Sequence, residues 1–355
     1  MRRPDPLPSI DEIGELLAGD GIDHVGVTTA EVLRETRGEL FRRRDAGLHD
    51  GMEFTYRNPE RSTDPTRAVA GARSVIVAAR SYLTDHDPPI PSEGAPARIG
   101  RYAWVDHYAP LRASLRAVAR RIRAADHRAV AFADDNSMVD RAVAHRAGLG
   151  WYGKNANLLL PGAGSWFVLG SIVTTAHYEP TDTTVADGCG SCRRCIDDCP
   201  TGAIVAPGVV DARRCLSWVL QKPGSIPDDL RLAIHDRIYG CDDCQDACPI
   251  SVRLGPRSTT VLEPQADAWI DALWLLTASD DDIELRFGHW YVHDRDLRWV
   301  RRNALVVVGN VGDPADGRVG PILDRYRSGI DPILAEHATW ALARLSERRA
   351  AAPSA

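Results

Sequence analysis

The sequence predicts an α+β multidomain protein, and three observations support this fold class. Helical and strand-like segments alternate over roughly the first 185 residues, all eight cysteines lie between Cys189 and Cys248, and strand signals fade after about Pro256. At 355 residues the chain exceeds one ordinary core, so two or three domains are expected. The predicted segments are an α/β domain, a cysteine-rich domain, an α-helical domain and a disordered tail, over residues 1–185, 186–255, 256–346 and 347–355.

Apolar periodicity predicts the elements of the first domain. Residues 10–18 and 30–44 carry the pattern of amphipathic helices. Three apolar runs rich in β-branched or aromatic residues are typical of buried strands. These runs cover residues 74–79, 129–133 and 166–174. Helices and strands that alternate in this way favour a layered α/β domain.

The segment after the second of these strands is a candidate site. The strand ends at Asp134, Ser137 can cap the helix that follows, and Gly148 can close it. Carboxylates at the carboxyl ends of parallel strands lie where ligands bind in open α/β sheets. Turns and helix caps also use aspartate for purely local reasons. From the residues alone, the local interpretation of Asp134 and Asp135 is favoured.

Cysteine spacing gives the strongest chemical signal. Residues 189–200 read C-x2-C-x2-C-x3-C-P, and residues 241–249 read C-x2-C-x3-C-P. In this pattern three cysteines hold one iron–sulfur cluster and the fourth ligates another. We therefore predict two [4Fe–4S] clusters in a ferredoxin-like two-cluster domain. Cluster one takes Cys189, Cys192, Cys195 and Cys248, and cluster two takes Cys199, Cys215, Cys241 and Cys244.

Disulfides and zinc fit these cysteines less well. Disulfides belong to secreted chains, and the N-terminus lacks the apolar stretch of a signal peptide. Tetrahedral zinc sites need neither the third closely spaced cysteine nor the proline after the fourth. No apolar run approaches the ~20 residues that cross a bilayer. We therefore expect a cytoplasmic protein with no membrane partner, because thiols stay reduced in that compartment.

Charge does not by itself indicate a nucleic-acid partner. The chain has 43 basic and 49 acidic residues, a net charge of −6. One predicted helix differs, because residues 111–123 place an apolar stripe on one face and arginines on another. These arginines are Arg112, Arg116, Arg120 and Arg123. The basic face could meet phosphates, and an ordinary solvated helix face explains it equally well.

The last third of the chain reads as helical. Residues 297–314 predict a helix closed by glycine and proline, and residues 322–326 and 332–345 predict two more. Short helices joined by Asp-Pro favour HEAT-like packing, but solenoids usually need three or more repeats. A plain helical hairpin is therefore an equal alternative. The tail over residues 347–355 is rich in Arg, Ala, Pro and Ser, and we expect it to be disordered.

Several motifs in this order resemble the epoxyqueuosine reductase family. They include RYAW at 101–104, AGLGWYGKN at 147–155, GSWFVLG at 164–170 and RIYGCDDCQDACP at 237–249. The resemblance runs from about residue 20 to residue 312. It implies an oxidoreductase of the last step of queuosine synthesis, which reduces epoxyqueuosine to queuosine at the wobble position of tRNA. It also implies cobalamin in an α/β corrinoid-binding domain, next to the two clusters, and a HEAT-like domain that helps hold tRNA.

The same resemblance implies roles for particular residues. Deoxygenation of an epoxide to an alkene consumes two electrons and two protons, and Asp134 falls on the family's proton donor. The positions carried over as cobalamin contacts are Tyr102, Arg141, Gly150, Trp151 and Lys154. The expected partners are the anticodon stem-loop of tRNA and an electron donor that the sequence does not identify. We expect a monomer.

The chain departs from the family pattern near the predicted site. Asp135, Asn136 and Ser137 stand where the family has Ser or Thr, Ala and Pro, and Asp140 replaces a glutamate. Ala109 stands where the family pattern predicts a histidine. A paralogous corrinoid and iron–sulfur reductase with another substrate is therefore an alternative. A ferredoxin-type electron carrier is a third, but it leaves the 185 or so residues before the clusters without a role.

Overall fold

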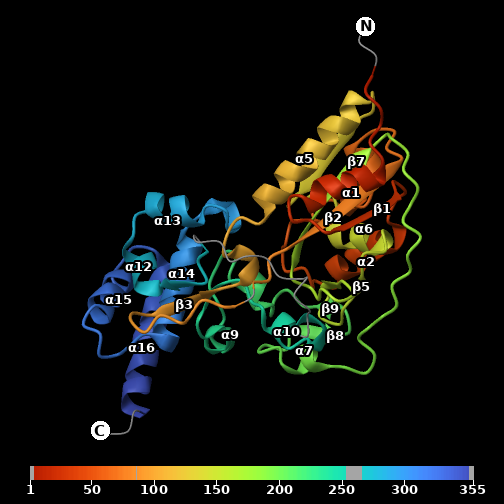
Figure 1. Cartoon of the computed structure of the whole chain (residues 1–355). Helices are drawn as coiled ribbons and strands as arrows, with labels where there is room; N and C mark the ends of the chain where they lie inside the picture. The colour runs from red at the N-terminus through yellow and green to blue at the C-terminus, as the bar shows by residue number, and fades with distance from the viewer. Residues whose placement is uncertain (1–3, 85, 253–265, 352–355) are drawn as a thin grey trace.

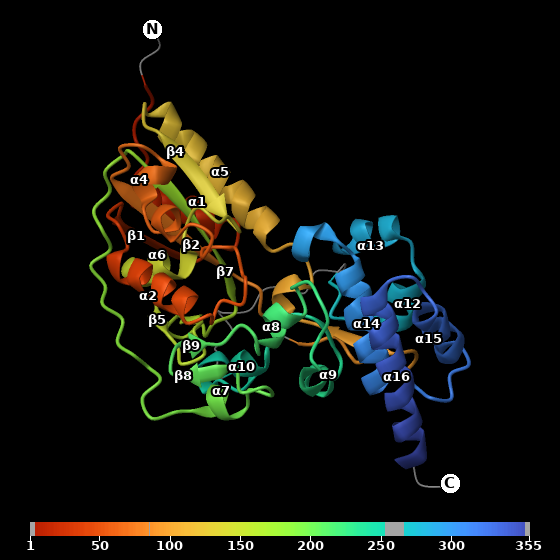
Figure 2. The ribbon, with the colours of Figure 1, turned by 180° about the vertical axis from the view of Figure 1, so that it is seen from behind.

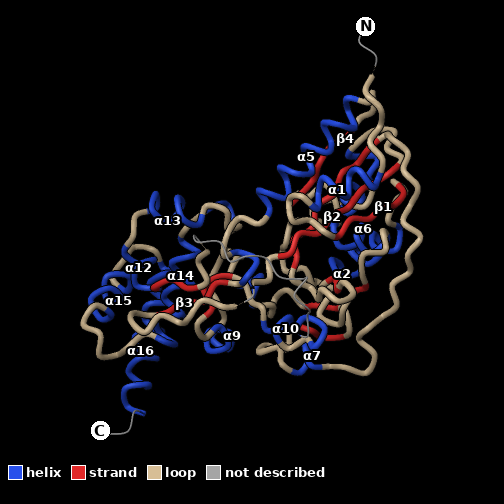
Figure 3. The backbone as a smooth tube through the Cα atoms, in the orientation of Figure 1, coloured by secondary structure: helices blue, strands red, loops and turns tan. Residues whose placement is uncertain are grey.

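The computed structural model of the chain describes residues 4–84, 86–252 and 266–351. A layered N-terminal domain and a group of C-terminal helices lie at opposite ends, with the cysteine region below and between them (Figure 1). The cysteine region consists mostly of loops and short helices, whereas longer helices and strands occupy the two ends (Figure 3). The described residues contain no helix with the length and apolar character that a membrane crossing requires.

The N-terminal domain is built on a four-stranded sheet in the order β1-β2-β7-β4. Its strands are His24–Thr29, Ser74–Ser81, Phe167–Thr174 and Ala129–Ala133. Every neighbouring pair is antiparallel, so the argument that places Asp134 at the carboxyl end of a parallel strand does not apply to this sheet. Alternation of helices and strands does not set strand direction. The chain leaves β1 at one end of the sheet and re-enters at that same end to form β2, and it does the same between β4 and β7. The strands of each pair therefore run in opposite directions.

Helices lie on both faces of this sheet (Figure 2). Helices α1 (Ile10–Ala18) and α5 (Tyr108–Ala124) pack on one face, and α6 (Asp140–Arg146) packs on the other. Successive residues of β2 point to opposite faces of the sheet. Ile76 packs with α1 and α5 on one face, whereas Val77 packs with α6 on the other. The predicted helix over residues 10–18 and the strand over 129–133 are confirmed at the same bounds.

A second core joins the C-terminal helices to earlier parts of the chain. Strand β3 (Pro96–Ile99) leaves the N-terminal domain and pairs with β10 (Arg237–Tyr239) and β11 (Trp269–Asp271). The same core includes α8 (Leu216–Val219) and α14 (Arg298–Val311). The predicted boundaries after residues 185 and 255 therefore do not separate independent cores. Local periodicity shows that a segment is buried, but it does not show which core buries it.

The shorter elements connect these units. Before the cysteines they are α2 (Arg34–Asp45), α3 (Pro59–Ser62), α4 (Pro65–Ala68), a 3-10 turn (Arg101–Ala103), β5 (Trp151–Tyr152) and β6 (Leu158–Leu159). Around the cysteines they are α7 (Arg194–Asp197), β8 (Ile204–Ala206), β9 (Val209–Val210), α9 (Asp228–Ile234), α10 (Asp243–Asp246) and α11 (Pro249–Val252). Further on they are α12 (Ala272–Thr277), α13 (Asp280–Phe287), a 3-10 turn (His293–Arg295) and α15 (Val319–Arg327).

The last helix corrects the prediction of a disordered tail. Helix α16 runs over Pro332–Ala351, so residues 347–351 are helical. Alanine and arginine favour helix, and the Arg348 guanidinium donates to the carbonyl oxygens of Gly309 and Gly312 at 3.3 and 2.7 Å. These contacts attach the last turns of α16 to the end of α14. The rest of the predicted tail, residues 352–355, lies outside the described residues.

Candidate redox and catalytic site

A cavity of about 1260 Å³ lies between the N-terminal domain and the cysteine region. Helix α2, the loop between β4 and α6, the cysteine-bearing loops and the end of α8 all contribute to its wall. Pockets for drug-sized ligands usually measure about 300–1,000 Å³. The cavity is therefore large enough for a bulky cofactor, or for a cofactor together with part of a substrate.

The four cysteines assigned to cluster two all line this cavity. They are Cys199, Cys215, Cys241 and Cys244. Burial raises the pKa of the Cys244 thiol well above its usual value, and the Cys241 and Cys215 thiols raise it further. Burial also raises the pKa of Cys215, with a contribution from Cys199. These influences link Cys244 with Cys241 and Cys215, and Cys215 with Cys199.

The four cysteines assigned to cluster one form a second group, which does not line the cavity. Burial raises the pKa of the Cys195 thiol to about 11, and Cys248, Cys189 and Cys192 raise it further. Cys192 is exposed, whereas Cys195 and Cys248 are buried. Cys195 also contributes to the raised pKa of Cys244, so the two groups adjoin. Cluster two would therefore lie between cluster one and the cavity.

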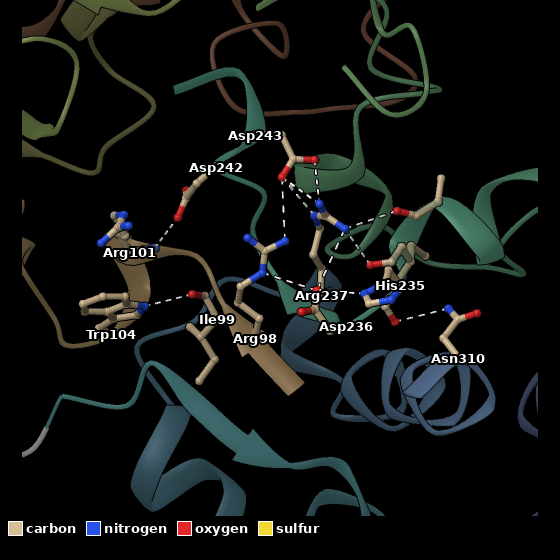
Figure 4. Close-up of polar contacts among 12 residues, drawn as sticks. Arg98, Ile99, Arg101, Trp104, His235, Asp236, Arg237, Asp242, Asp243 and Asn310 are labelled. Carbon is tan, nitrogen blue, oxygen red and sulfur yellow. Dashed lines mark hydrogen bonds and ion pairs between the residues drawn. The ribbon is translucent and has the colours of Figure 1, made fainter. Parts of the chain in front are cut away.

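Two aspartates fix the loop between the last two cluster-two cysteines (Figure 4). Asp242 accepts a hydrogen bond from the backbone N–H of Arg101 at 2.7 Å. Both oxygens of Asp243 accept hydrogen bonds from Arg237 Nη2 at 2.7 Å, and Arg98 Nη2 lies 3.7 Å from Oδ1. Arg98 belongs to β3 and Arg237 to β10, so the sheet of the second core holds this cysteine loop in place.

Helix α14 holds the segment that follows Cys215. Arg302 of this helix is fully buried, and its guanidinium donates to the carbonyl oxygens of Lys222, Gly224 and Val219 at 2.8, 2.7 and 3.0 Å. These oxygens lie at and just beyond the end of α8, where helical carbonyls lack partners of their own. Burial lowers the pKa of Arg302 to about 9, so the side chain remains a cation at neutral pH.

Asn303, the next residue of α14, contacts two segments that carry cluster-two cysteines. Asn303 is also fully buried, and its Nδ2 donates to the carbonyl oxygens of Leu220 and Ile238 at 2.8 and 3.1 Å. Leu220 follows α8, whereas Ile238 lies in β10, three residues before Cys241. We call Arg302 and Asn303 the α14 clamp. It connects the C-terminal helices directly to the segments that carry cluster two.

Asp134 faces the cavity from the loop after β4. Its backbone φ is +54°, a left-handed conformation that turns the chain sharply out of the strand. Burial raises the pKa of its carboxyl group, Arg112 and Arg295 lower it, and Asp106 and Asp135 raise it, with a net upward shift. The side chain is open to the cavity even so. A carboxyl group with a raised pKa is suited to donate a proton near neutral pH.

The loop after Asp134 corrects the predicted helix cap. Helix α6 begins at Asp140 and its N-cap residue is Val139, which has no capping side chain. Ser137 instead accepts a hydrogen bond from Arg61 Nη2 at 3.1 Å, and its backbone N–H donates to Asp135 Oδ1 at 2.7 Å. Because that turn already satisfies the Ser137 backbone, the helix starts later than the cap pattern predicts.

Four polar atoms of the cavity-lining residues are buried and have no hydrogen-bond partner among the described residues. They are Arg43 Nε, His49 Nδ1, Asp140 Oδ1 and Asp242 Oδ1. Burial raises the pKa of Asp140 well above its usual value, and Asp134 and Asp135 raise it further. Buried polar groups in native proteins are nearly always paired, with protein, water or ligand. These atoms are therefore suited to contact a polar ligand in the cavity.

Two of the predicted cofactor contacts line the cavity. Tyr102 is one, and burial raises the pKa of its hydroxyl well above the usual value. Gln221 Nε2 donates to this hydroxyl at 3.3 Å. Arg141 is the other, and its Nη1 donates to the carbonyl oxygen of Ala156 at 3.3 Å. The structure thus brings these two residues to the same cavity as Asp134.

Gly150, Trp151 and Lys154 do not line the cavity, so their predicted contact with the cofactor stays a prediction. Trp151 packs in a small core with Leu159 and Cys248. A Cβ atom at Gly150 would lie 2.1 Å from the Leu159 carbonyl oxygen, so only glycine fits this close approach.

The third of these residues supports the first cysteine loop. Lys154 Nζ donates to the carbonyl oxygens of Gly190 and Cys192 at 2.6 and 2.9 Å. The β5–β6 hairpin turns this glycine-rich segment toward the first cysteine loop, which keeps Trp151 and Lys154 away from the cavity wall. Tyr152 and Asn155 of the same segment do line the cavity.

Sequence reasoning also missed residues of the cavity wall. Tyr82 and Tyr108 line it, and Tyr82 accepts a hydrogen bond from Gln245 Nε2 at 3.2 Å. His145, one helical turn after Arg141, lines it too, and that four-residue spacing was the available signal. His107 is buried outside the cavity lining, 3.2 Å from Arg80 Nη1 through its Nδ1, and burial lowers its pKa to about 4.

The chain resembles known proteins in both sequence and structure. Residues 188–251 match a family model described as a 4Fe-4S double cluster binding domain, and residues 62–138 match one described as Epoxyqueuosine reductase QueG, DUF1730. The chain is 32% identical over 348 residues to epoxyqueuosine reductase of Lactococcus garvieae, covering 97% of this chain and 98% of the relative. It is 34% identical over 363 residues to that of Xanthomonas campestris pv. campestris, with the same coverages. A crystal structure of epoxyqueuosine reductase with a tRNA-Tyr epoxyqueuosine-modified stem loop superposes with a TM-score of 0.85 at 29% identity, covering 94% of this chain and 89% of that one.

Proposed function

We infer the function from the premise that this chain belongs to the epoxyqueuosine reductase family. The chain is an oxidoreductase that reduces epoxyqueuosine in tRNA to queuosine, the final step of queuosine biosynthesis. One observation carries the inference: the four cluster-two cysteines and Asp134 line the same cavity. An electron source and a proton source thus meet in one space that is large enough for a bulky cofactor.

We propose that the cavity holds cobalamin. Its volume, the residues Tyr102 and Arg141, and the unpaired atoms of His49, Asp140 and Asp242 support this proposal. Cobalamin would supply a reduced cobalt centre that is able to open the epoxide. The protein supplies the rest: it feeds electrons to the cavity, excludes bulk water and donates a proton.

The reaction breaks both C–O bonds of the epoxide, forms a C=C bond and releases the oxygen as water, consuming two electrons and two protons. We propose that electrons enter at cluster one, which includes the exposed Cys192, and reach the cavity through cluster two. Asp134 would give a proton to the epoxide oxygen as the C–O bond breaks, which avoids a costly alkoxide in a water-poor site.

The remaining assignments are also proposals. Residues 1–185 would hold cobalamin, residues 186–255 would hold the clusters, and the C-terminal helices would act as a HEAT-like unit that helps bind the anticodon stem-loop of tRNA. We propose a cytoplasmic monomer that receives electrons from a separate donor. The related crystal structure with a tRNA stem loop supports the RNA partner.

The first prediction tests this function directly. The protein, reconstituted with iron, sulfide and cobalamin, is reduced anaerobically in the presence of epoxyqueuosine-containing tRNA. We expect nucleoside mass analysis to show loss of one oxygen and the appearance of queuosine. The matched control is the Cys215→Ser variant, which removes one cluster-two ligand and should leave epoxyqueuosine unchanged.

One observation favours a second candidate function. Asp135 and Asn136 line the cavity at positions where the family pattern has Ser or Thr and Ala. A paralogous reductase with the same cofactors and another substrate would use these side chains for recognition. Absence of conversion, with cluster and corrinoid spectra intact, would support this paralogue and contradict the tRNA substrate.

A second prediction concerns the pH dependence of turnover. Arg112 lowers the pKa of Asp134, so Arg112→Gln should raise it. Because the proton donor must be protonated, activity falls as pH rises through this pKa, and the fall should occur at higher pH in the variant. The measurement is kcat against pH at saturating tRNA. Arg121→Gln, on the other flank of the same helix, is the control and should keep the wild-type profile. An unchanged profile in Arg112→Gln would contradict the role of Asp134.

A further inference from the structure

Helix α5 carries a concentration of positive charge that contrasts with the rest of the chain. It contains five arginines and no acidic residue, whereas the whole chain has a net charge of −6. Four of the arginines follow one face at helical spacing, and we call them the arginine stripe. The stripe consists of Arg112, Arg116, Arg120 and Arg123. Arg121 lies on the other flank of the helix.

The middle of this stripe is unpaired. Arg116 and Arg120 are exposed, and no hydrogen bond, ion pair or ring contact engages either side chain in the described parts of the chain. Arg123 donates to the carbonyl oxygen of Ala129 at 2.7 Å, and Arg112 contacts that of Ala133 at 3.5 Å. Unpaired guanidinium groups in a regular row are suited to bind a regular row of anions.

The stripe leads away from the cavity. Tyr108, the first residue of α5, lines the cavity, and Arg112, one turn later, acts on the pKa of Asp134. From Arg112 to Arg123 the helix rises roughly 16 Å at about 1.5 Å per residue. In both ribbon views α5 covers the flank of the N-terminal domain that is turned toward the C-terminal helices (Figures 1 and 2).

We propose that the arginine stripe binds the phosphate backbone of the anticodon stem while the anticodon loop reaches the cavity. This inference rests on the proposed function and specifies how the RNA is oriented. Phosphate contacts fix the register of a nucleic acid without reading its bases. Arg116 and Arg120 are therefore binding residues that take no part in the chemistry, whereas Arg112 also acts on the pKa of Asp134.

An acidic protein, such as an electron carrier, is the other occupant that this charge could attract. The position of the stripe favours RNA, because it starts beside Asp134, where the modified base must lie. Helix α7, near cluster one, and the C-terminal end of α5 lie on opposite sides of the N-terminal domain (Figure 1). An electron carrier that reduces cluster one would therefore bind away from the stripe.

The test measures RNA binding by the cluster-loaded protein in the absence of turnover. The double variant Arg116→Glu, Arg120→Glu is titrated with a fluorescently labelled anticodon stem-loop at several salt concentrations. We expect its Kd to rise at least about tenfold and the slope of log K against log salt to fall by about 1.4–1.8, which is two phosphate contacts. Arg121→Glu, on the other flank of α5, is the matched control and should change Kd much less.

Further variants and assays separate the possible outcomes. Arg116→Lys, Arg120→Lys should bind nearly as well as the wild type, because it keeps the charge. With saturating tRNA, the glutamate variant should keep the wild-type kcat and show only a raised KM. Wild-type Kd and salt slope in the glutamate variant would overturn the inference, and so would a defect confined to reduction of the clusters by a protein donor. Stripe-dependent binding without any conversion of epoxyqueuosine would instead refute the proposed function alone.

Discussion

The Asp134→Asn variant should reduce epoxyqueuosine at least about 10²-fold more slowly than the wild type, the lower end of what a general acid contributes. Asparagine keeps the size and polarity of the side chain but has no acidic proton. The epoxide oxygen would then leave as an alkoxide in a cavity that holds the pKa of this carboxyl group above its usual value by burial. Single-turnover conversion of epoxyqueuosine-containing tRNA, with the clusters reduced beforehand, measures the effect on chemistry.

The control for this variant is its neighbour in the same loop. Asp135 also lines the cavity, and it raises the pKa of Asp134. Asp135→Asn should therefore keep turnover and move the loss of activity to lower pH. Both variants should keep the cluster and corrinoid spectra of the wild type. Full activity in Asp134→Asn would show that another group donates the proton.

Local signals were predicted well from the sequence because they need no knowledge of the fold. Apolar periodicity predicted a helix over residues 10–18, and α1 covers these same residues, with a reciprocal capping box of Ser9 and Glu12 at its start. The spacing of the cysteines predicted a domain with two [4Fe–4S] clusters, and residues 188–251 match a family model of that description. Ligand spacing within a tight loop is a local property, so the sequence alone was sufficient to predict this domain, whereas the assignment of each cysteine to a cluster stays a prediction.

Features that depend on distant contacts were not predicted. Pro96–Ile99 gives no sign in its own residues that it joins β10 and β11 in the second core. The family resemblance predicted that Trp151 and Lys154, in a glycine-rich segment, contact the cofactor. The β5–β6 hairpin directs these two residues toward the first cysteine loop. Composition shows that a segment permits close approach, whereas the tertiary fold decides what approaches it.

The α14 clamp is the least expected part of the site. Nothing in the sequence of α14 suggests that Arg302 and Asn303 point inward, because both are polar residues in a helix of mixed character. In the structure they contact the chain after Cys215 and the strand before Cys241. The C-terminal helices are therefore joined to cluster two by buried hydrogen bonds, in addition to any role in RNA binding.

We expect Arg302→Met to destabilise cluster two selectively. The substitution leaves the carbonyl oxygens of Val219, Lys222 and Gly224 without their donor, at roughly 1–3 kcal/mol for each buried group. Part of this cost is offset because the variant no longer buries a cation. The loss falls on the segment that carries Cys215. Iron content should then drop by about half, and the EPR signal of cluster two should disappear while that of cluster one remains.

Two further variants make this prediction specific. Arg298→Met removes another α14 arginine, whose partners Asp296 and Asp331 lie at the partly exposed surface, and it should change stability by less than about 1 kcal/mol. Asn303→Ala should weaken cluster two in the same direction as Arg302→Met, because it releases both Leu220 and Ile238. Full iron content in Arg302→Met would contradict the clamp, as would equal loss of both clusters, which indicates general unfolding. Selective loss of cluster two would mean that the C-terminal helices hold the last electron carrier in place beside the cavity, so that a helix remote from the chemistry is needed for the electrons to arrive.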